Sequence, residues 1–407
     1  MKKSKASNRD TLAIHGGAPV RATPMPPRFA LGPAEEKAIA EAIAYYRARG
    51  LDPGYQGHFE DLYCRAFADF HGGGHADAVA SGTAALYVAV AALELPKGAE
   101  VVVSPITDPG TLSAIILNGL TPRLADSAPG GFNIDAERFR ARVTAGTRAV
   151  VVVHAFGQAT DIEAIAVEAK RRDIRVVEDC SQSHGARRRG RLIGTFGEVA
   201  AFSTMYRKAH ITGACGGVVY SRDEEIFHRA LAYADRGKPR WRDDFDDRDP
   251  NQFLMPALNL HSDEISCAIG IRSLARMADT IERRRRYVAG VVDGLAKADC
   301  GCTAHRPSAE DSPFVLPAFV DPARVSCDAE TFAGAVAAEG IGLNPHYQYL
   351  VADWPWLKPH LADGFETANA RAARDRSFNL YLNENYGAAE VRDTVAAIAK
   401  VARHFRA

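Results

Sequence analysis

The sequence lacks the features that would assign the chain to several special classes of protein. No apolar run approaches the roughly 18 residues that a membrane-spanning helix needs. The seven cysteines are scattered and include no CxxC pair, which argues against a disulfide framework or a cysteine zinc site. Lys and Arg number 50, as do Asp and Glu, so the net charge is zero. We therefore expect neither a nucleic-acid nor a membrane partner.

The N-terminus also lacks a targeting pattern. It starts basic, as MKKSKASNRDTLAIHGG, but no apolar segment follows, so we expect no signal peptide and a cytoplasmic location. No metal site is expected, because three glycines separate His71 from His75 and prevent a rigid pair of ligands. What remains is ordinary: 407 residues, 47% hydrophobic and 25% charged, is the composition of a globular protein of two or three domains.

Three segments of the chain differ in pattern. Residues 1–30 are polar and proline-rich, which predicts an extended arm rather than a packed element. From about residue 78 to 220, short β-type runs alternate with helical stretches, which predicts that residues 31–260 form a large α/β domain with a mostly parallel sheet and helices on both faces. Residues 261–407 predict a smaller α+β domain. The expected strands of the large domain are 100–104, 122–125, 149–154, 175–178, 199–203 and 217–220, and a charged surface loop is expected at 236–252.

Three local patterns suggest a binding site in the large domain. Ser81-Gly82-Thr83 stands where a β-type run ends and a helix begins, and free N–H groups there can bind phosphate. A plain helix N-cap explains the same residues. Glu178 and Asp179 follow an apolar strand at its carboxyl end, where ligands sit in open α/β sheets, although two surface acids opening a loop would look the same.

The third pattern is Lys208, which lies between an apolar strand and the glycine-rich segment 213–217, with Ser203 five residues before it. A desolvated lysine is nucleophilic, whereas most lysines are simply solvated. In combination the patterns are more specific. A phosphate turn, an Asp after a strand and a Ser-x4-Lys together describe a pyridoxal phosphate (PLP) site, with Gly82, Thr83 and Ser203 at the phosphate, Asp179 at the pyridine nitrogen and Lys208 forming the Schiff base.

The motifs resemble those of the DegT/StrS family of PLP-dependent sugar aminotransferases, which have the aspartate aminotransferase fold, fold type I. SGTAAL (81–86), GAEVVVSPIT (98–107), VVVVHAFGQATD (150–161) and EDCSQSHGARRRGRLIGTFGEVAAFS (178–203) carry the resemblance. It implies that Gln182 lies near the cofactor's 3-hydroxyl. It also implies a homodimer with shared sites, in which Asn259 reaches the neighbouring subunit's cofactor phosphate.

Three positions depart from the family's pattern. Asp108 replaces an aromatic residue that stacks on the pyridine ring, the segment GACGG replaces GEGG, and His261 replaces an arginine. These departures concern the substrate more than the cofactor. His154 and His184, at strand ends, are either site residues or core histidines. The candidate substrate residues are Asp108, His184, His346 and Tyr347.

The resemblance implies an aminotransferase that moves an amino group from glutamate or glutamine to a keto sugar, nucleotide-linked, or to a keto-cyclitol. PLP would alternate with pyridoxamine phosphate. Two alternatives remain open at this point: a PLP-dependent sugar dehydratase, and a non-catalytic protein that keeps the fold as a sensor or partner. Related dehydratases have histidine in place of the lysine, so Lys208 favours transamination.

Overall fold

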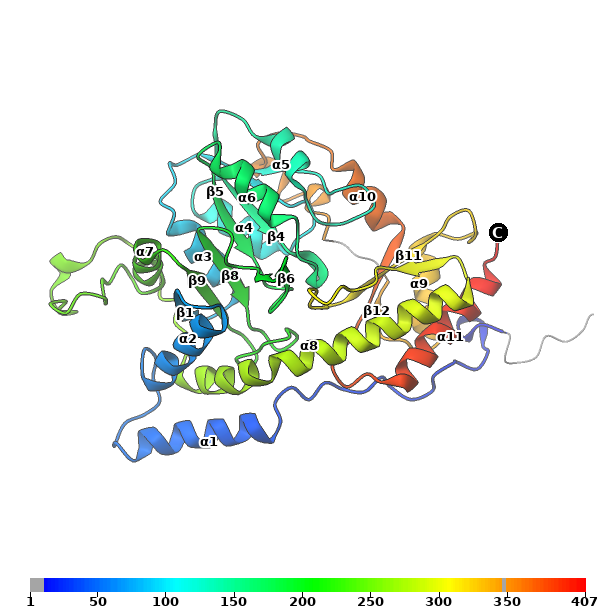
Figure 1. Ribbon diagram of the computed structural model, residues 1–407, viewed down its shortest axis with the longest axis horizontal. Helices are drawn as coiled ribbons and strands as arrows, with labels where there is room; N and C mark the ends of the chain where they lie inside the picture. Colours follow the sequence, from blue (N-terminus) through cyan, green and yellow to red (C-terminus); the bar gives the residue numbers. More distant parts are fainter. Residues whose placement is uncertain (1–10, 346–348) are drawn as a thin grey trace, which may run out of the picture.

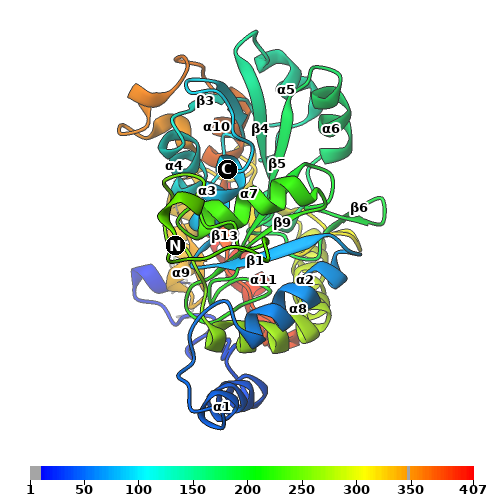
Figure 2. The same ribbon diagram turned by 90° about the vertical axis from the view of Figure 1, so that its left-hand side faces the viewer.

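The computed structural model describes residues 11–345 and 349–407 and contains a large mixed sheet. Its seven strands run in the order β1-β9-β8-β5-β4-β2-β3 (Figures 1 and 2). Strands β8, β5, β4, β2 and β3 are parallel to one another, and β9 is antiparallel to both of its neighbours. The mostly parallel sheet is thus confirmed. The strand bounds are β1 His75–Val79, β2 Glu100–Val103, β3 Thr121–Leu124, β4 Thr147–Val153, β5 Arg175–Asp179, β8 Val199–Ser203 and β9 Gly217–Ser221.

Helices cover both faces of this sheet, because successive strand residues point to opposite sides. Val101, Val103 and Val151 pack with helices α3 and α4 on one face. Val102 and Val150 pack with α5 and α6 on the other face. The apolar runs are continuous since both sides are buried. The helices around the sheet are α2 His58–Phe70, α3 Gly82–Ala91, α4 Pro109–Leu117, α5 Ala136–Arg142, α6 Ile162–Lys170 and α7 Glu224–Ala234.

A second, antiparallel sheet is formed by the C-terminal part of the chain, in the order β10-β11-β13-β12. The 35-residue helix α8 (Glu264–Ala298) packs against α2 near its start and against α11 further along, and so passes from one sheet to the other (Figure 1). The division of the chain at residue 260 stays a prediction. The elements of this part are β10 Cys302–Ala304, β11 Leu316–Val320, α9 Ala329–Ala338, β12 Leu343–Asn344, α10 Ala368–Asp375, β13 Ser377–Leu380 and α11 Ala388–His404.

The described part of the N-terminal segment, residues 11–30, is extended, but contrary to expectation it is anchored to the core. Leu12 is fully buried in the core around the second sheet. The N–H groups of Ala13 and Val20 donate to the carboxylate of Glu339, which also forms a buried ion pair of 2.9 Å with Lys400. The proline-rich composition predicts the extended backbone and does not reveal these distant partners. Helix α1 (Pro33–Arg47) then lies on the outer side of α8 (Figure 2).

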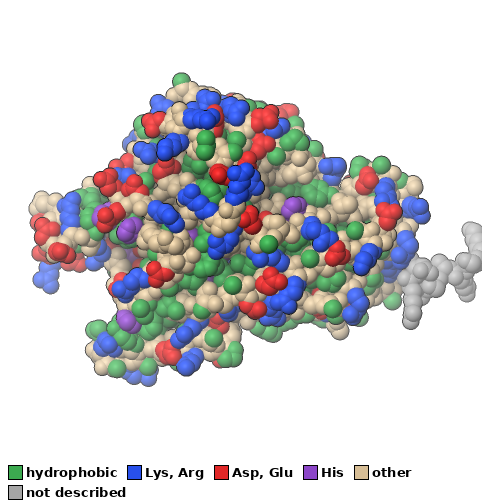
Figure 3. Space-filling view, viewed as in Figure 1, with side chains coloured by type: hydrophobic (Ala, Val, Ile, Leu, Met, Phe, Trp, Pro, Cys, Tyr) green, Lys and Arg blue, Asp and Glu red, His purple; other side chains and the backbone are tan. Residues whose placement is uncertain are grey.

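The surface of the molecule carries both charge signs. On the face shown in Figure 3, acidic and basic side chains are interspersed, as zero net charge allows. The charged loop expected at 236–252 projects beyond α7 and contains only one short 3-10 turn, Pro250–Gln252 (Figure 1). Among the described helices, none has the length and apolarity required to cross a membrane.

Candidate active site

A cavity of about 950 Å³ opens at the carboxyl ends of the parallel strands. Residues from the ends of four strands meet there. Ser81 follows β1, Asp108 follows β2, Asp179 is the last residue of β5 and Ser203 is the last residue of β8. Ligands of open α/β sheets bind at this edge. Six of the predicted cofactor residues line the cavity, namely Gly82, Thr83, Asp179, Gln182, Ser203 and Lys208.

Lys208 is buried in the wall of the cavity, with 8% of its surface exposed. Its ammonium nitrogen lies 4.2 Å from the ring centre of Phe314. Burial lowers the pKa of Lys208 to about 8, against the opposing effect of the Asp179 and Asp108 carboxylates, while Arg284 lowers it further. A substantial fraction of this amine is therefore neutral and nucleophilic near pH 8.

Asp179 is held in place by two hydrogen bonds. The hydroxyl of Thr111 donates to its Oδ2 at 2.9 Å, and the N–H of Ser181 donates to its Oδ1 at 3.1 Å. The hydroxyl of Thr107 donates in turn to Thr111 at 2.7 Å. A fixed carboxylate at a cavity wall can stabilise a protonated ring nitrogen.

The turn that begins α3 is built for close approach of a ligand. Ser81 caps the helix by accepting from the N–H of Ala84 at 3.1 Å. The N–H groups before Ala84 have no partner within the helix, because they belong to its first turn. A Cβ at Gly82 would lie 2.4 Å from the Cβ of Ser203, so only glycine lets the helix start meet strand β8. The Ser203 side chain and these N–H groups thereby share one corner of the cavity, as an anion site requires.

Gln182 occupies another side of the cavity. Its amide oxygen accepts from the N–H of Phe156 at 2.8 Å, so the amide has a fixed orientation. Phe156 has a left-handed backbone, with φ of 62°, inside the short turn that follows β4. The hydrogen bond from this unusual backbone therefore positions the predicted contact to the cofactor's 3-hydroxyl.

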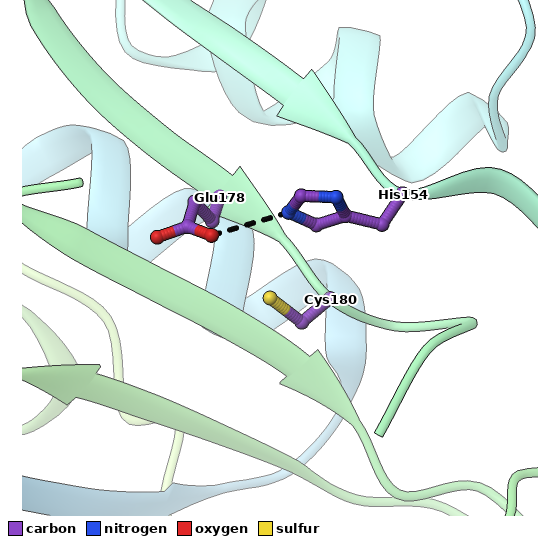
Figure 4. A group of neighbouring side chains, drawn as sticks. All are labelled: His154, Glu178 and Cys180. Atoms are coloured by element: carbon purple, nitrogen blue, oxygen red, sulfur yellow. Dashed lines mark hydrogen bonds and ion pairs between the residues drawn. The ribbon is translucent and has the colours of Figure 1, made fainter. Parts of the chain in front are cut away.

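Glu178, the neighbour of Asp179, points to the other face of the sheet. The N–H groups of Gly194, Phe196 and Gly197 donate to it at 2.7 to 2.8 Å, and His154 Nε2 lies 3.2 Å away (Figure 4). Burial alone would raise the pKa of Glu178, but the bonds from His154 and the backbone outweigh burial and lower it. Glu178 is therefore a structural anion that ties the loop after β5 to the sheet.

His154, Glu178 and Cys180 lie close enough together to resemble a metal site (Figure 4). The N–H of Thr160 donates to His154 Nδ1 at 3.1 Å, so Nδ1 acts as an acceptor and Nε2 is the nitrogen that faces Glu178. Both ring nitrogens are thus in use, and burial raises the pKa of the Cys180 thiol well above its usual value. Such a set is a hydrogen-bonded core cluster, and His154 is a core histidine.

Two other predicted residues, Asn259 and His184, do not line the cavity. Asn259 is exposed, pairs with Asp235 through the backbone and does not line the cavity of its own chain. His184 is also absent from the cavity wall: it is buried against Phe202, and we no longer assign it to the substrate. His346 and Tyr347 lie outside the described residues.

Several cavity residues escape prediction from the sequence. Arg28, from the N-terminal segment, donates to Glu384 at 2.9 Å and to the carbonyl of Tyr206, two residues before the lysine. Phe314 comes from the segment before β11. Neither position has a local motif, because only the fold brings it to Lys208. Thr111 has a weak signal, since it lies one helical turn after Thr107.

The geometry agrees with the similarity to known proteins. The model of the DegT/DnrJ/EryC1/StrS aminotransferase family matches residues 39–399. The chain belongs to this family. It is accordingly a PLP-dependent aminotransferase of fold type I, which confirms the class, fold and cofactor expected from the sequence.

Two relatives and one solved structure illustrate the family. The chain is 31% identical to a putative L-glutamine:3-amino-2,3-dideoxy-scyllo-inosose aminotransferase of Streptoalloteichus tenebrarius, over 97% of this chain and 98% of the relative. It is 35% identical to the L-glutamine:2-deoxy-scyllo-inosose aminotransferase of Micromonospora echinospora, over 54% of this chain and 52% of that one. An aminotransferase structure from Psychrobacter cryohalolentis superposes with a TM-score of 0.85 at 24% identity, covering 94% and 100% of the two chains.

The residues of the cavity fit PLP. A desolvated lysine, a fixed carboxylate and a helix start that tolerates no side chain at Gly82 are the three groups that the cofactor's aldehyde, ring nitrogen and phosphate require. Thr83 is the second residue of this helix. A Cβ added to Gly110 would lie 2.4 Å from the hydroxyl oxygen of Thr83. The phosphate corner is therefore closely packed by two neighbouring turns.

Proposed function

We propose that this aminotransferase moves the amino group of glutamine or glutamate to the ketone of a cyclitol or sugar. The observation that carries the proposal is the pairing of a buried, partly neutral Lys208 with Asp179 in one cavity. A lysine whose pKa is near the ambient pH can both give and take a proton. Transamination requires this proton transfer in each of its two half-reactions.

The cavity residues divide the chemistry between them. Bound PLP supplies the electron sink that stabilises negative charge at the donor's Cα. Lys208 Nζ takes the proton from that Cα in the first half-reaction and returns one to the acceptor carbon in the second. Asp179 holds a proton on the ring nitrogen, and Thr111 keeps the carboxylate in line. The buried wall excludes water from the lysine.

A keto-cyclitol is the acceptor class that we favour. The full-length relative and the partial relative described above are both named for L-glutamine and an inosose, which is a keto-cyclitol. The dTDP- and GDP-sugar enzymes among the relatives keep a keto sugar as the second class. Glutamine is the donor that the first two names support.

The experiment is a turnover assay with mass spectrometry. Holoenzyme with glutamine and 2-deoxy-scyllo-inosose should yield an amino-cyclitol, with glutamate and nucleotide-linked keto sugars tested in parallel. Lys208→Ala is the control, because it keeps the cavity and removes the amine. Equal product from the control, or no amino transfer to any acceptor by the native enzyme, would contradict the proposal.

Neither alternative has support from a specific observation. Lys208 occupies the position that related dehydratases fill with histidine, so dehydration lacks its expected residue. A non-catalytic role would not require the hydrogen-bonded alignment of Thr107, Thr111 and Asp179. Consumption of pyridoxamine phosphate without an amino donor would favour dehydration over the proposed reaction.

We also propose a homodimer with shared sites, in which Asn259 completes the neighbouring subunit's phosphate site. Its exposure and its absence from the chain's own cavity support this role. The test mixes Lys208→Ala subunits with Asn259→Ala subunits under conditions of exchange. A shared site gives each mixed dimer one native and one doubly damaged site, so activity should exceed that of either parent. Proven exchange without recovery would refute the shared site.

We also propose a cytoplasmic location for this enzyme. All seven cysteines are free thiols, and Cys215 lies exposed at the cavity. Reducing conditions suit such thiols. Fractionation of the native host should recover the protein with cytoplasmic markers, and recovery with secreted proteins would contradict this location.

A further inference from the structure

The charged residues that line the cavity are few and have unequal tasks. They are Arg28, Asp108, Asp179, Arg207 and Lys208 among the described residues. Both oxygens of Asp179 accept hydrogen bonds from the protein. Asp108 is the second acid of the cavity, and it is exposed there. A carboxylate in a partly enclosed site favours a cationic partner.

Asp108 also caps helix α4, which uses only one of its oxygens. Its Oδ1 accepts from the N–H of Gly110 at 2.9 Å. Within the described part of the chain, no hydrogen bond or ion pair is recorded for Oδ2. Asn or Ser at this position would cap the helix equally well without a charge. Capping therefore explains the hydrogen bond and leaves the negative charge unexplained.

The position of Asp108 relates it to the reacting groups. The backbone of Gly110 is close-packed on Thr83 of the phosphate corner, so the start of α4 lies beside the start of α3. Asp108, Asp179 and Lys208 line the same cavity, and both carboxylates oppose the lowering of the lysine's pKa. A substrate that presents its carbonyl to Lys208 lies within the field of Asp108.

We propose that the Asp108 carboxylate selects an acceptor that carries a cationic amine besides its reacting ketone. This inference rests on the proposed function and deepens it by naming a substituent and the residue that reads it. The amine would donate to Oδ2, while Oδ1 keeps its bond to Gly110. An anionic substituent at the same place would be repelled. Asp108 therefore discriminates between acceptors by repulsion as well as by attraction.

The test compares two cyclitols that differ at one substituent. 3-Amino-2,3-dideoxy-scyllo-inosose carries an amine where 2-deoxy-scyllo-inosose carries a hydroxyl. With glutamine as donor, the native holoenzyme should favour the amine-bearing ketone by about 10- to 100-fold in kcat/KM, the range of a charged hydrogen bond. Asp108→Asn keeps the cap and should bring this ratio close to one by slowing the amine-bearing acceptor alone.

Asp223→Asn is the matched control. Asp223 caps α7 in the same way, by accepting from the N–H of Ile226 at 3.0 Å, and it does not line the cavity. This variant should keep the native preference. Calorimetric affinities of the three holoproteins for the two cyclitols should show the same pattern, and they give a readout even without turnover.

The outcomes separate this inference from the proposed function. Glutamine alone should change the cofactor's absorbance equally in native enzyme and Asp223→Asn; failure in the native enzyme would overturn the proposed function itself. A normal glutamine step with no native preference for the amine would overturn only the role of Asp108. Retention of the preference by Asp108→Asn, or equal damage to the glutamine step, would overturn it as well.

Discussion

Glu178 and Asp179 are neighbours with the same functional group, yet the two faces of strand β5 give them different tasks. Glu178 accepts three backbone N–H bonds and one from His154, and its side chain is fully buried. Asp179 accepts from Thr111 and Ser181 and lines the cavity.

The difference follows from the alternation of side chains along a strand. Val176 and Glu178 point toward the core under α6, whereas Val177 and Asp179 point toward the core under α3. One carboxylate therefore stabilises the loop that follows the strand, and the other is available to the cofactor. Removing each charge in turn should separate stability from catalysis.

The largest effect is expected from Asp179→Asn. The neutral amide cannot hold a proton on the ring nitrogen, so kcat should fall by about three orders of magnitude. The free energy of unfolding should change by no more than about 1 kcal/mol, because the amide oxygen can still accept from Thr111 or Ser181. Steady-state kinetics and denaturant unfolding measure the two quantities. A near-normal kcat would place the ring nitrogen's partner elsewhere.

Glu178→Gln should show the opposite pattern. The new NH2 group faces several N–H donors and leaves buried groups unpaired. The free energy of unfolding should therefore fall by about 3 kcal/mol. Urea unfolding at neutral pH measures the loss. At a temperature where the variant stays folded, kcat should remain within about tenfold of the native value. Full stability together with a collapse of kcat would reverse the two assignments.

Thr111→Val should have a smaller effect on catalysis. The substitution removes the hydroxyl that donates to Asp179 and keeps the shape of the side chain. One lost hydrogen bond of about 1.5 kcal/mol corresponds to roughly a tenfold fall in kcat. Thr107→Val, which removes the more distant hydroxyl, should cost less. Equal losses would mean that the two hydroxyls do not act in sequence.

The smallest effect concerns the protonation of Lys208. Its pKa is lowered to about 8, so the neutral amine gains population as the pH rises toward and through that value. The rate at which apoprotein captures PLP should rise about tenfold per pH unit below a midpoint near 8. Asp179→Asn should move the midpoint lower, because the carboxylate raises the lysine's pKa. The glutamate variant, Glu178→Gln, should leave it unchanged, and an equal shift in both would contradict the comparison.

Prediction from the sequence succeeds where the signal is local. The apolar runs at 100–104 and 199–203 correctly predict strands β2 and β8, and the small residues Ser81-Gly82-Thr83 correctly predict the start of a helix. The two acids taken alone leave open which of Glu178 and Asp179 faces the cavity; the combination of motifs selects Asp179, and Asp179 lines the cavity. Arg28 is beyond the reach of local signals, because its contact with Glu384 joins residues 356 positions apart.

His184 shows a further limit. A histidine near a catalytic strand is polar and could serve the substrate, but the aromatic cluster around Phe202 buries it. Burial lowers its pKa well below the usual value, which keeps the ring neutral in the core. The sequence gives the residue type, and only the packing decides its environment.

The most direct test of the account is to locate the cofactor's covalent attachment. Holoprotein reduced with borohydride and digested should carry the pyridoxyl group on the peptide that contains Lys208, and fragmentation should place it on that residue. Lys208→Ala should carry no label, and Lys238→Ala, which removes a lysine outside the cavity, should keep it. Attachment at another lysine in the native protein, or a label that survives in Lys208→Ala at full occupancy, would contradict the central assignment.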